Sequence, residues 1–164
     1  ILFPEADVLD LMSSWLSHLP TEPNLGRVAG LGLNNSELEK NARLTEHCVQ
    51  DLNSITTLPY PSNRFDFVFI AVSIQYLIRP FEIFSEIARV LRIDGQVVVS
   101  MSHRCFPTKA VRAFRELDLN QRISILGQYI ERGREFSVYE LIDRSPVGAD
   151  PLWIVRARRR DNND

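Results

Sequence analysis

The chain contains little of what a disulfide scaffold or a metal centre requires. Its 164 residues include two cysteines, Cys48 and Cys105, and three histidines. Two cysteines favour free thiols in a reducing compartment, cytoplasmic or organellar, over a disulfide framework. The cysteines and histidines show no metal-ligand spacing, so we predict no metal site.

Long apolar runs and an excess of one charge are also lacking. No apolar run approaches the roughly 20 residues that a membrane-spanning helix needs. The formal net charge of −2 gives no general attraction to nucleic acid or to a membrane surface. The one basic run, residues 156–160, is typical of a solvated strand end. We therefore predict a globular protein with neither a nucleic-acid nor a membrane partner.

Glycine is missing where a nucleotide-binding turn would need it. Residues 8–11 read VLDL, a short apolar strand with one carboxylate. The turn that follows, residues 12–16, reads MSSWL and holds none of the chain's seven glycines. No G-x-G-x-x-G follows a strand, which disfavours a nucleotide-linked oxidoreductase.

Strand-like and helix-like segments alternate along the chain. We predict strands at residues 8–12, 27–33, 47–52, 65–72, 96–101, 136–142 and 152–157. We predict helices at residues 15–19, from 36 toward 44, from 80 onward, at 109–117 and from 120 to 133, with N-caps at Ser36, Thr108 and Asn120. This order favours an α/β fold with a parallel sheet, in one domain over residues 1–158 with a polar tail at 159–164. Ligands of such sheets bind beyond the carboxyl ends of the strands.

Four segments resemble a known family. They read VLDL, RVAGLGLN, VQDLNSITTLPYPSNRFDFVF and IARVLRIDGQVVVSM, in this order. They are similar to segments of the class I S-adenosylmethionine-dependent methyltransferases, especially the small-molecule, type-11-like members. The L-P-Y, R-F-D-x-V and R-V-L-R-x-x-G matches are the most specific. The resemblance implies a Rossmann-like sheet of seven mostly parallel strands in the order 3-2-1-4-5-7-6, with helices on both faces.

The resemblance also implies a set of cofactor-binding positions for S-adenosylmethionine. They are Asp10, Met12, Ser14, Gly30, Gly32, Asn34, Asp51, Leu52 and Ala71. Asp10 either accepts from the cofactor amine or only orients the turn. Asp51 and Leu52 match the pair that borders the adenine ring, although Asp51 is equally plausible as a simple strand-end residue. Ala71 matches a position that faces the methyl group.

Two regions depart from the family's pattern, the first turn and the end of the second strand. The glycines of its first turn fall on Met12, Ser14 and Leu16, so either these side chains fill cofactor space or the turn takes another path. Gly32 stands where the family has an acid that receives both ribose hydroxyls. A hydrogen bond to a charged group contributes about 1.5–3 kcal/mol, so its loss predicts binding weaker by about ten- to a hundredfold. Asn34 and the residue after it are either neutral replacements or plain turn residues.

The substrate side is predicted after the fourth and fifth strands. The candidate substrate contacts are Ser73, Gln75, Arg104 and Cys105, and the candidate catalytic residues are His103 and Tyr76. His103 is suited to act as a general base near neutral pH, or it is a surface residue. Arg104 can clamp an acidic substrate, and Cys105 is a nucleophile only if its pKa is lowered.

Two functions follow from these features. The first is S-adenosylmethionine-dependent methyl transfer to a small molecule, with a weakened cofactor site and a divergent first motif. The alternative is a catalytically inactive binding or scaffold domain that no longer binds the cofactor. We also predict a homodimer, formed in one version by exchange of a terminal element, because about seven residues precede the first strand and apolar surface near that edge would stay open.

Overall fold

The computed structural model describes residues 2–103, 106, 108–132 and 134–161. The strands are β1 (Val8–Leu11), β2 (Val28–Gly32), β3 (Glu46–Val49), β4 (Phe65–Ala71), β5 (Leu91–Met101), β6 (Glu140–Asp143) and β7 (Trp153–Arg158). The helices are α1 (Asn35–Lys40), α2 (Pro80–Val90), α3 (Arg112–Glu116) and α4 (Leu119–Glu131), with a 3-10 turn η1 (Ile74–Tyr76). No helix among these residues is long and apolar enough to cross a membrane.

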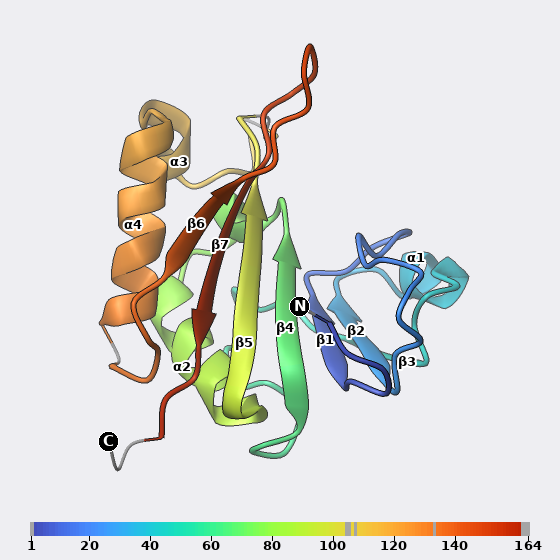
Figure 1. Cartoon of the computed structure of the whole chain (residues 1–164). Helices are drawn as coiled ribbons and strands as arrows, with labels where there is room; N and C mark the ends of the chain where they lie inside the picture. The colour runs from blue at the N-terminus through green and yellow to red at the C-terminus, as the bar shows by residue number, and fades with distance from the viewer. Residues whose placement is uncertain (1, 104–105, 107, 133, 162–164) are drawn as a thin grey trace.

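All seven strands form one sheet, in the order β3-β2-β1-β4-β5-β7-β6 (Figure 1). Neighbours from β3 to β5 pair in parallel, whereas β7 runs antiparallel to both β5 and β6. The predicted fold class and strand order are therefore confirmed. Because β1 to β5 point the same way, their carboxyl ends share one edge of the sheet, at the top in Figure 1.

The main apolar core lies between the sheet and helices α2 and α4. Val68 and Ile70 of β4 point into it from alternate positions, as the two-residue period of a strand requires. α2 contributes Ile83, Phe84 and Ile87 from one helical face. Burial of each such side chain contributes about 1.5–3 kcal/mol to the free energy of folding, so this layer is a main source of the sheet's stability.

The opposite face of the sheet is covered more thinly. Val8 and Phe67 belong to a small second cluster, on which Leu19 and Leu25 pack from the segment between β1 and β2. α1 lies on this face as well, because Gly32 alternates with the core-facing Leu31 and its open side meets Leu38. The sheet therefore has helices on both faces, but only one face carries long ones.

The helix predicted at residues 15–19 does not form, and residues 12–27 contain no helix. Trp15 and Leu16 are 50% and 74% exposed, so Leu19 alone of the large apolar side chains in this segment packs against the sheet. The hydrogen bonds of a single helical turn with so little tertiary packing do not offset the entropy cost of helix nucleation. The two serines that precede it, Ser13 and Ser14, form hydrogen bonds to Asp10 and Glu37 instead of capping a helix.

Other helix ends differ from prediction by a few residues. Asn34, not Ser36, caps α1, because its side-chain oxygen accepts from the Ser36 N–H at 3.0 Å. Asp118, not Asn120, caps α4 in a reciprocal capping box with Gln121. α3 begins at Arg112 rather than after Thr108. The residue before it, Val111, makes no side-chain cap hydrogen bond.

Candidate functional site

The turn after β1 is held by a buried polar cluster. Asp10 is 3% exposed, and its Oδ2 accepts from Ser13 Oγ at 2.6 Å and from Ser17 Oγ at 2.5 Å. Asn41, just after α1, donates its amide to the Ser14 carbonyl at 2.8 Å and to Ser17 Oγ at 3.1 Å. We call Asp10, Ser13, Ser17 and Asn41 the turn cluster. It folds residues 13–17 back onto the end of β1.

Asp10 is engaged within this cluster. Burial raises the pKa of its carboxyl, and the two serine hydroxyls and His18 act in the opposite direction. Of the two roles predicted for Asp10, orientation of the turn is the one that these contacts perform. Its role toward the cofactor stays a prediction.

The same turn presses against the end of β2. Met12 has a φ of 63°, a left-handed conformation that is uncommon outside glycine and asparagine, and it redirects the chain after β1. The Ser13 N–H donates to the Leu31 carbonyl at 2.8 Å. A Cβ atom on Gly32 would overlap the Ser13 carbonyl oxygen. The close approach of the Ser13 carbonyl to Gly32 therefore connects the two departures: with the turn in this position, residue 32 has no room for an acidic side chain.

The other predicted positions near β2 and β3 also have partners of their own. Gly30 lies against Leu44, whose side chain a Cβ atom would overlap. The Asn34 amide donates to Glu37 Oε1 at 3.0 Å, and Ser14 Oγ donates to Glu37 Oε2 at 2.5 Å. These contacts tie α1 to the turn after β1.

Asp51 lies in the loop after β3 and is exposed. Its carboxylate accepts from the Asn53 N–H at 2.9 Å and from Ser54 Oγ at 2.8 Å, which shapes a local turn. Leu52 beside it is buried in the main core. Asp51 keeps solvent access and thus the capacity to accept further hydrogen bonds.

The end of β4 has a different character. After Ala71 the chain passes through Val72, whose φ is 43°. Ser73 and Gln75 are both buried, and Gln75 donates its amide to the Val72 carbonyl at 2.7 Å. Ser73 Oγ has no hydrogen-bond partner among the described residues. Tyr76 OH accepts from the Phe106 N–H at 3.0 Å and so joins the loops after β4 and β5.

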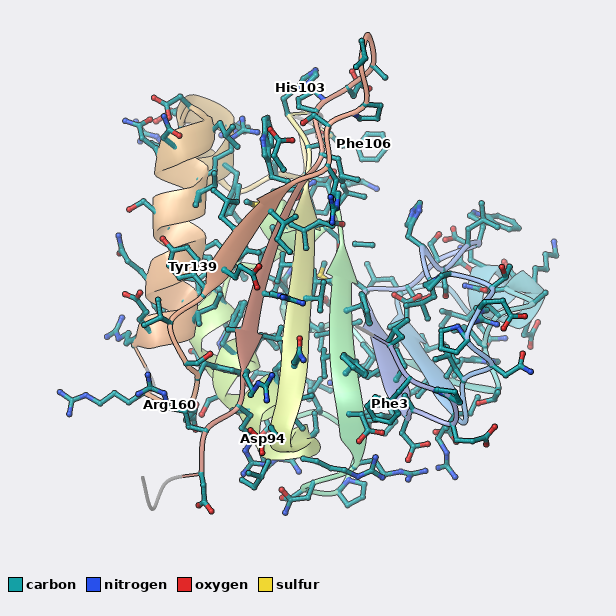
Figure 2. All side chains as sticks on the ribbon, in the orientation of Figure 1. Phe3, Asp94, His103, Phe106, Tyr139 and Arg160 are labelled. Carbon is teal, nitrogen blue, oxygen red and sulfur yellow. The ribbon has the colours of Figure 1, made fainter. Side chains whose placement is uncertain are left out.

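The end of β5 carries the second buried hydroxyl of this kind. Ser102 Oγ is also without a partner in the part of the chain that the structure describes. His103, next to it, is 56% exposed, and its Nε2 lies 3.6 Å from Asp150 Oδ1. Asp150 belongs to the connection between β6 and β7, which projects beyond the sheet near His103 and Phe106 (Figure 2). Arg104 and Cys105 lie outside the described residues.

Sequence reasoning missed several residues that matter here. The turn cluster joins positions up to 31 residues apart, from Asp10 to Asn41, so no local pattern signals it. Asp150 likewise reaches His103 only through the β6–β7 connection. Ser102 directly precedes the candidate His103 at the carboxyl end of β5, so its position in the sequence could have indicated it.

Exposed apolar side chains surround this edge. Every strand from β1 to β5 is followed by at least one large hydrophobic residue with more than a third of its surface exposed: Trp15, Leu16, Leu33, Ile55, Ile78 and Phe106. Apolar surface with a few polar groups between is the usual composition of a small-molecule site. The edge therefore has the composition of a ligand site.

The family model of methyltransferase domains matches residues 12–99, slightly more than half of the chain. No curated protein matches the sequence.

Several solved structures share the fold. A chain of the Haloferax volcanii complex containing the Trm112 methyltransferase activator aligns with a TM-score of 0.74 and 13% identity, over 98% of this chain and 85% of that one. An S-adenosylmethionine-dependent methyltransferase from Mesorhizobium loti aligns with a TM-score of 0.68 and 13% identity, over 95% and 92%. Phosphoethanolamine N-methyltransferase 2 from Haemonchus contortus aligns with a TM-score of 0.67 and 17% identity, over 98% and 50%. At such low identities these likenesses show the fold alone.

Proposed function

We propose, because the chain belongs to the family of methyltransferase domains, that it binds S-adenosylmethionine, the donor typical of that family, and methylates a small molecule. Both ligands would lie over the carboxyl ends of β1 to β5. The proposal places a weak hold on the donor at β1 and β2 and the reaction at β4 and β5.

One observation carries this proposal. Ser73 Oγ and Ser102 Oγ, from the ends of the adjacent strands β4 and β5, are buried without a hydrogen-bond partner among the described residues. Leaving such a hydroxyl unpaired costs about 1–3 kcal/mol, so two of them at one edge support the proposal that a ligand binds there. The apolar side chains around them supply the water-excluding surface that such a ligand needs.

The residues present fit the donor in part. By the family resemblance, Asp51 and Leu52 would border the adenine ring and Ala71 would face the methyl group. Asp10 already accepts two hydroxyl hydrogen bonds, and position 32 has no space for a carboxylate. We therefore propose that the amino-acid tail and the ribose are held less firmly than the adenine. Each lost hydrogen bond to a charged group weakens binding by about ten- to a hundredfold.

The catalytic roles follow from position. The bound donor supplies a methyl group on a positively charged sulfur, which is a good leaving group, so most of the rate comes from alignment. His103 would take the proton from the acceptor at Nδ1 as the acceptor is methylated, with its Nε2–H facing Asp150, whose carboxylate would stabilise the resulting imidazolium. Tyr76, Ser73 and Gln75 would orient the acceptor. Arg104 and Cys105 remain proposed substrate contacts.

Calorimetric titration with S-adenosylmethionine and S-adenosylhomocysteine tests the proposal. We expect saturable heat with dissociation constants of roughly 0.1–1 mM, that is about −5.5 to −4 kcal/mol. The double substitution Ser73→Ala and Ser102→Ala should lower methyl transfer with little effect on donor affinity. Absence of heat and of a thermal shift at millimolar ligand would overturn it.

A second candidate is a binding or scaffold domain that does not take the donor. The turn cluster favours this candidate, because it uses Asp10 and the serines after β1 internally. The same titration separates the two candidates, since the scaffold predicts no donor binding at any concentration.

We also propose self-association. Phe3 is 48% exposed beside the thinly covered face of the sheet, where its ring lies 5.7 Å from that of Phe67. A homodimer that covers this face, with or without exchange of the N-terminal segment, would bury that surface. Light scattering that gives a single monomer mass at working concentration would count against it.

A further inference from the structure

A second place with ligand-binding chemistry lies away from the carboxyl edge, where α2 packs on α4. A hollow of about 170 Å³ opens between these helices and the segment after α4. Its wall includes four aromatic rings, those of Phe81, Phe84, Tyr129 and Phe136. Arg160, whose N–H donates to the carbonyl of the adjoining Glu135, lies at the opposite end of the molecule from His103 (Figure 2).

Two pairs of the rings around this hollow stand roughly perpendicular, whereas Phe84 and Tyr129 are tilted at 45°. Tyr129 meets Phe81 edge to face, with centroids 5.2 Å apart and planes at 85°. Phe136 meets Phe84 in the same way, at 6.4 Å and 79°. A space among perpendicular rings is bordered by ring faces as well as ring edges, and ring faces carry the negative end of the quadrupole. Such faces attract cations.

One ring already holds a cation of the chain itself. The guanidinium carbon of Arg132 lies 4.3 Å from the centroid of Phe81. Arg132 is exposed, so this contact can exchange with solvent. The face of the Phe81 ring therefore already makes a cation–π contact in this structure.

A carboxylate completes the set. Glu135 is half-buried at the hollow, and Ser85 Oγ donates to its Oε1 at 3.4 Å. No lysine or arginine nitrogen within the described ranges lies at ion-pair distance from it, although Arg159 acts on it from farther away. Burial raises the pKa of Glu135, as expected for a carboxyl that lacks a close cationic partner.

We propose that this hollow binds a small methylated ammonium group, with the ring faces as its walls and the Glu135 carboxylate as its counter-charge. The volume equals that of about six water molecules, enough for a trimethylammonium headgroup of choline size. Arg132 competes with this ligand for the Phe81 ring. The site is separate from the carboxyl edge, so it does not depend on donor binding there.

Choline chloride and its neutral isostere 3,3-dimethylbutan-1-ol are the probes, titrated separately into the full chain at constant ionic strength. The readout is the aromatic NMR signals of Phe81 and Tyr129. We expect saturable shifts with choline and affinity for the alcohol lower by about tenfold, the effect of roughly 1.4 kcal/mol of cation–π and charge attraction. Equal affinity for the two probes, or no shift of these rings with choline, would overturn the proposal.

Two charge substitutions with opposite expected effects sharpen this test. Glu135→Gln should weaken choline binding by about five- to tenfold, and Arg132→Gln should tighten it by about two- to threefold. Glu131→Gln, at the exposed end of α4, is the matched control and should change nothing. An equal loss in Glu131→Gln and Glu135→Gln would show that only net charge matters and would contradict the assignment. Should Glu135→Gln fail to fold, the sign of the Arg132→Gln effect decides.

Discussion

The carboxyl ends of β1 and of β4–β5 belong to the same edge of one sheet, but their buried polar side chains differ in whether they have hydrogen-bond partners. At β1, Asp10 and its serines satisfy one another and are tied to Asn41. At β4 and β5, Ser73 and Ser102 each keep a buried hydroxyl without a partner among the described residues. The polar groups after β1 bond to one another, whereas the two serine hydroxyls after β4 and β5 have no partner within the described part of the chain.

This difference shows that two parts of one sheet edge can be arranged differently above a shared core. The core beneath both ends is continuous and includes Leu9, Leu11, Val68 and Val99. Most of that core comes from the strands and from helices α2 and α4, so the turn after β1 can close on itself without loss of the sheet order. The substitutions below probe each side of this contrast.

The largest effect is expected where the turn meets β2. Gly32→Asp restores the acid typical of the family but places a side chain where the Ser13 carbonyl lies. We expect a loss of about 3 kcal/mol in the free energy of unfolding, from overpacking and displacement of the turn. Leu33→Asp is the control, because Leu33 is exposed and the same acid there should cost little. Equal stability of the two variants in urea titrations would contradict the close contact.

Removal of Asp10 should have the next largest effect. Asp10→Ala deprives Ser13 and Ser17 of their shared acceptor and should cost about 2 kcal/mol. Asp51→Ala removes the equivalent strand-end acid after β3, where the carboxylate is exposed, and should cost less than about 1 kcal/mol. Chemical denaturation of both variants compares the two ends directly. A larger loss in Asp51→Ala would reverse our assignment of structural and accessible acids.

A smaller effect should appear in the pH dependence of stability. Burial raises the pKa of Asp10 in the folded chain, so the folded state holds this proton more tightly than the unfolded state does. The stability of the native chain relative to Asp10→Asn should therefore be greatest at low pH. It should fall as pH rises from the ordinary aspartate range, near 3.8, through the raised pKa. The measurement is the unfolding free energy of both chains across this pH range. A stability difference that rises with pH would show that the partners of Asp10 stabilise its carboxylate, and it would contradict this prediction.

The smallest effect distinguishes the hydroxyls by sign. Ser73→Ala removes a buried group that lacks a partner and should leave stability unchanged or raise it by up to about 1 kcal/mol. Ser13→Ala removes a donor to Asp10 and should lower stability by about 1 kcal/mol. Thermal unfolding of the two variants under one buffer condition measures the difference. A matching loss in both would mean that Ser73 is structurally engaged after all.

The fold could be predicted from sequence to a large extent, for physical reasons. The run FDFVFIA is apolar at nearly every position, which suits β4 as a central strand, and α2 shows its buried face in the spacing of Phe84, Ile87 and Val90. The strand order came from the family resemblance. The absence of a helix after β1 could not be predicted, because the competing contacts come from Asn41, which is distant in sequence.

The candidate site was predictable only in outline. The edge and the strand ends follow from the topology. They place Ser73 and Tyr76 after β4 and His103 after β5, and a hydrogen bond from the Phe106 N–H to Tyr76 OH joins the two loops. Whether a given polar group is satisfied depends on contacts across the molecule, as Asp10 and Ser102 illustrate. The binding roles of these residues remain proposals.

The most direct measurement compares two ligands that differ at the end contested by β1. S-adenosylhomocysteine carries the amino-acid tail, and 5′-methylthioadenosine lacks it. If the turn after β1 has withdrawn from ligand binding, calorimetry should give affinities that agree within about fivefold, or roughly 1 kcal/mol. A preference for S-adenosylhomocysteine of about a hundredfold or more would show that the turn grips the tail and would contradict the proposed division of this edge.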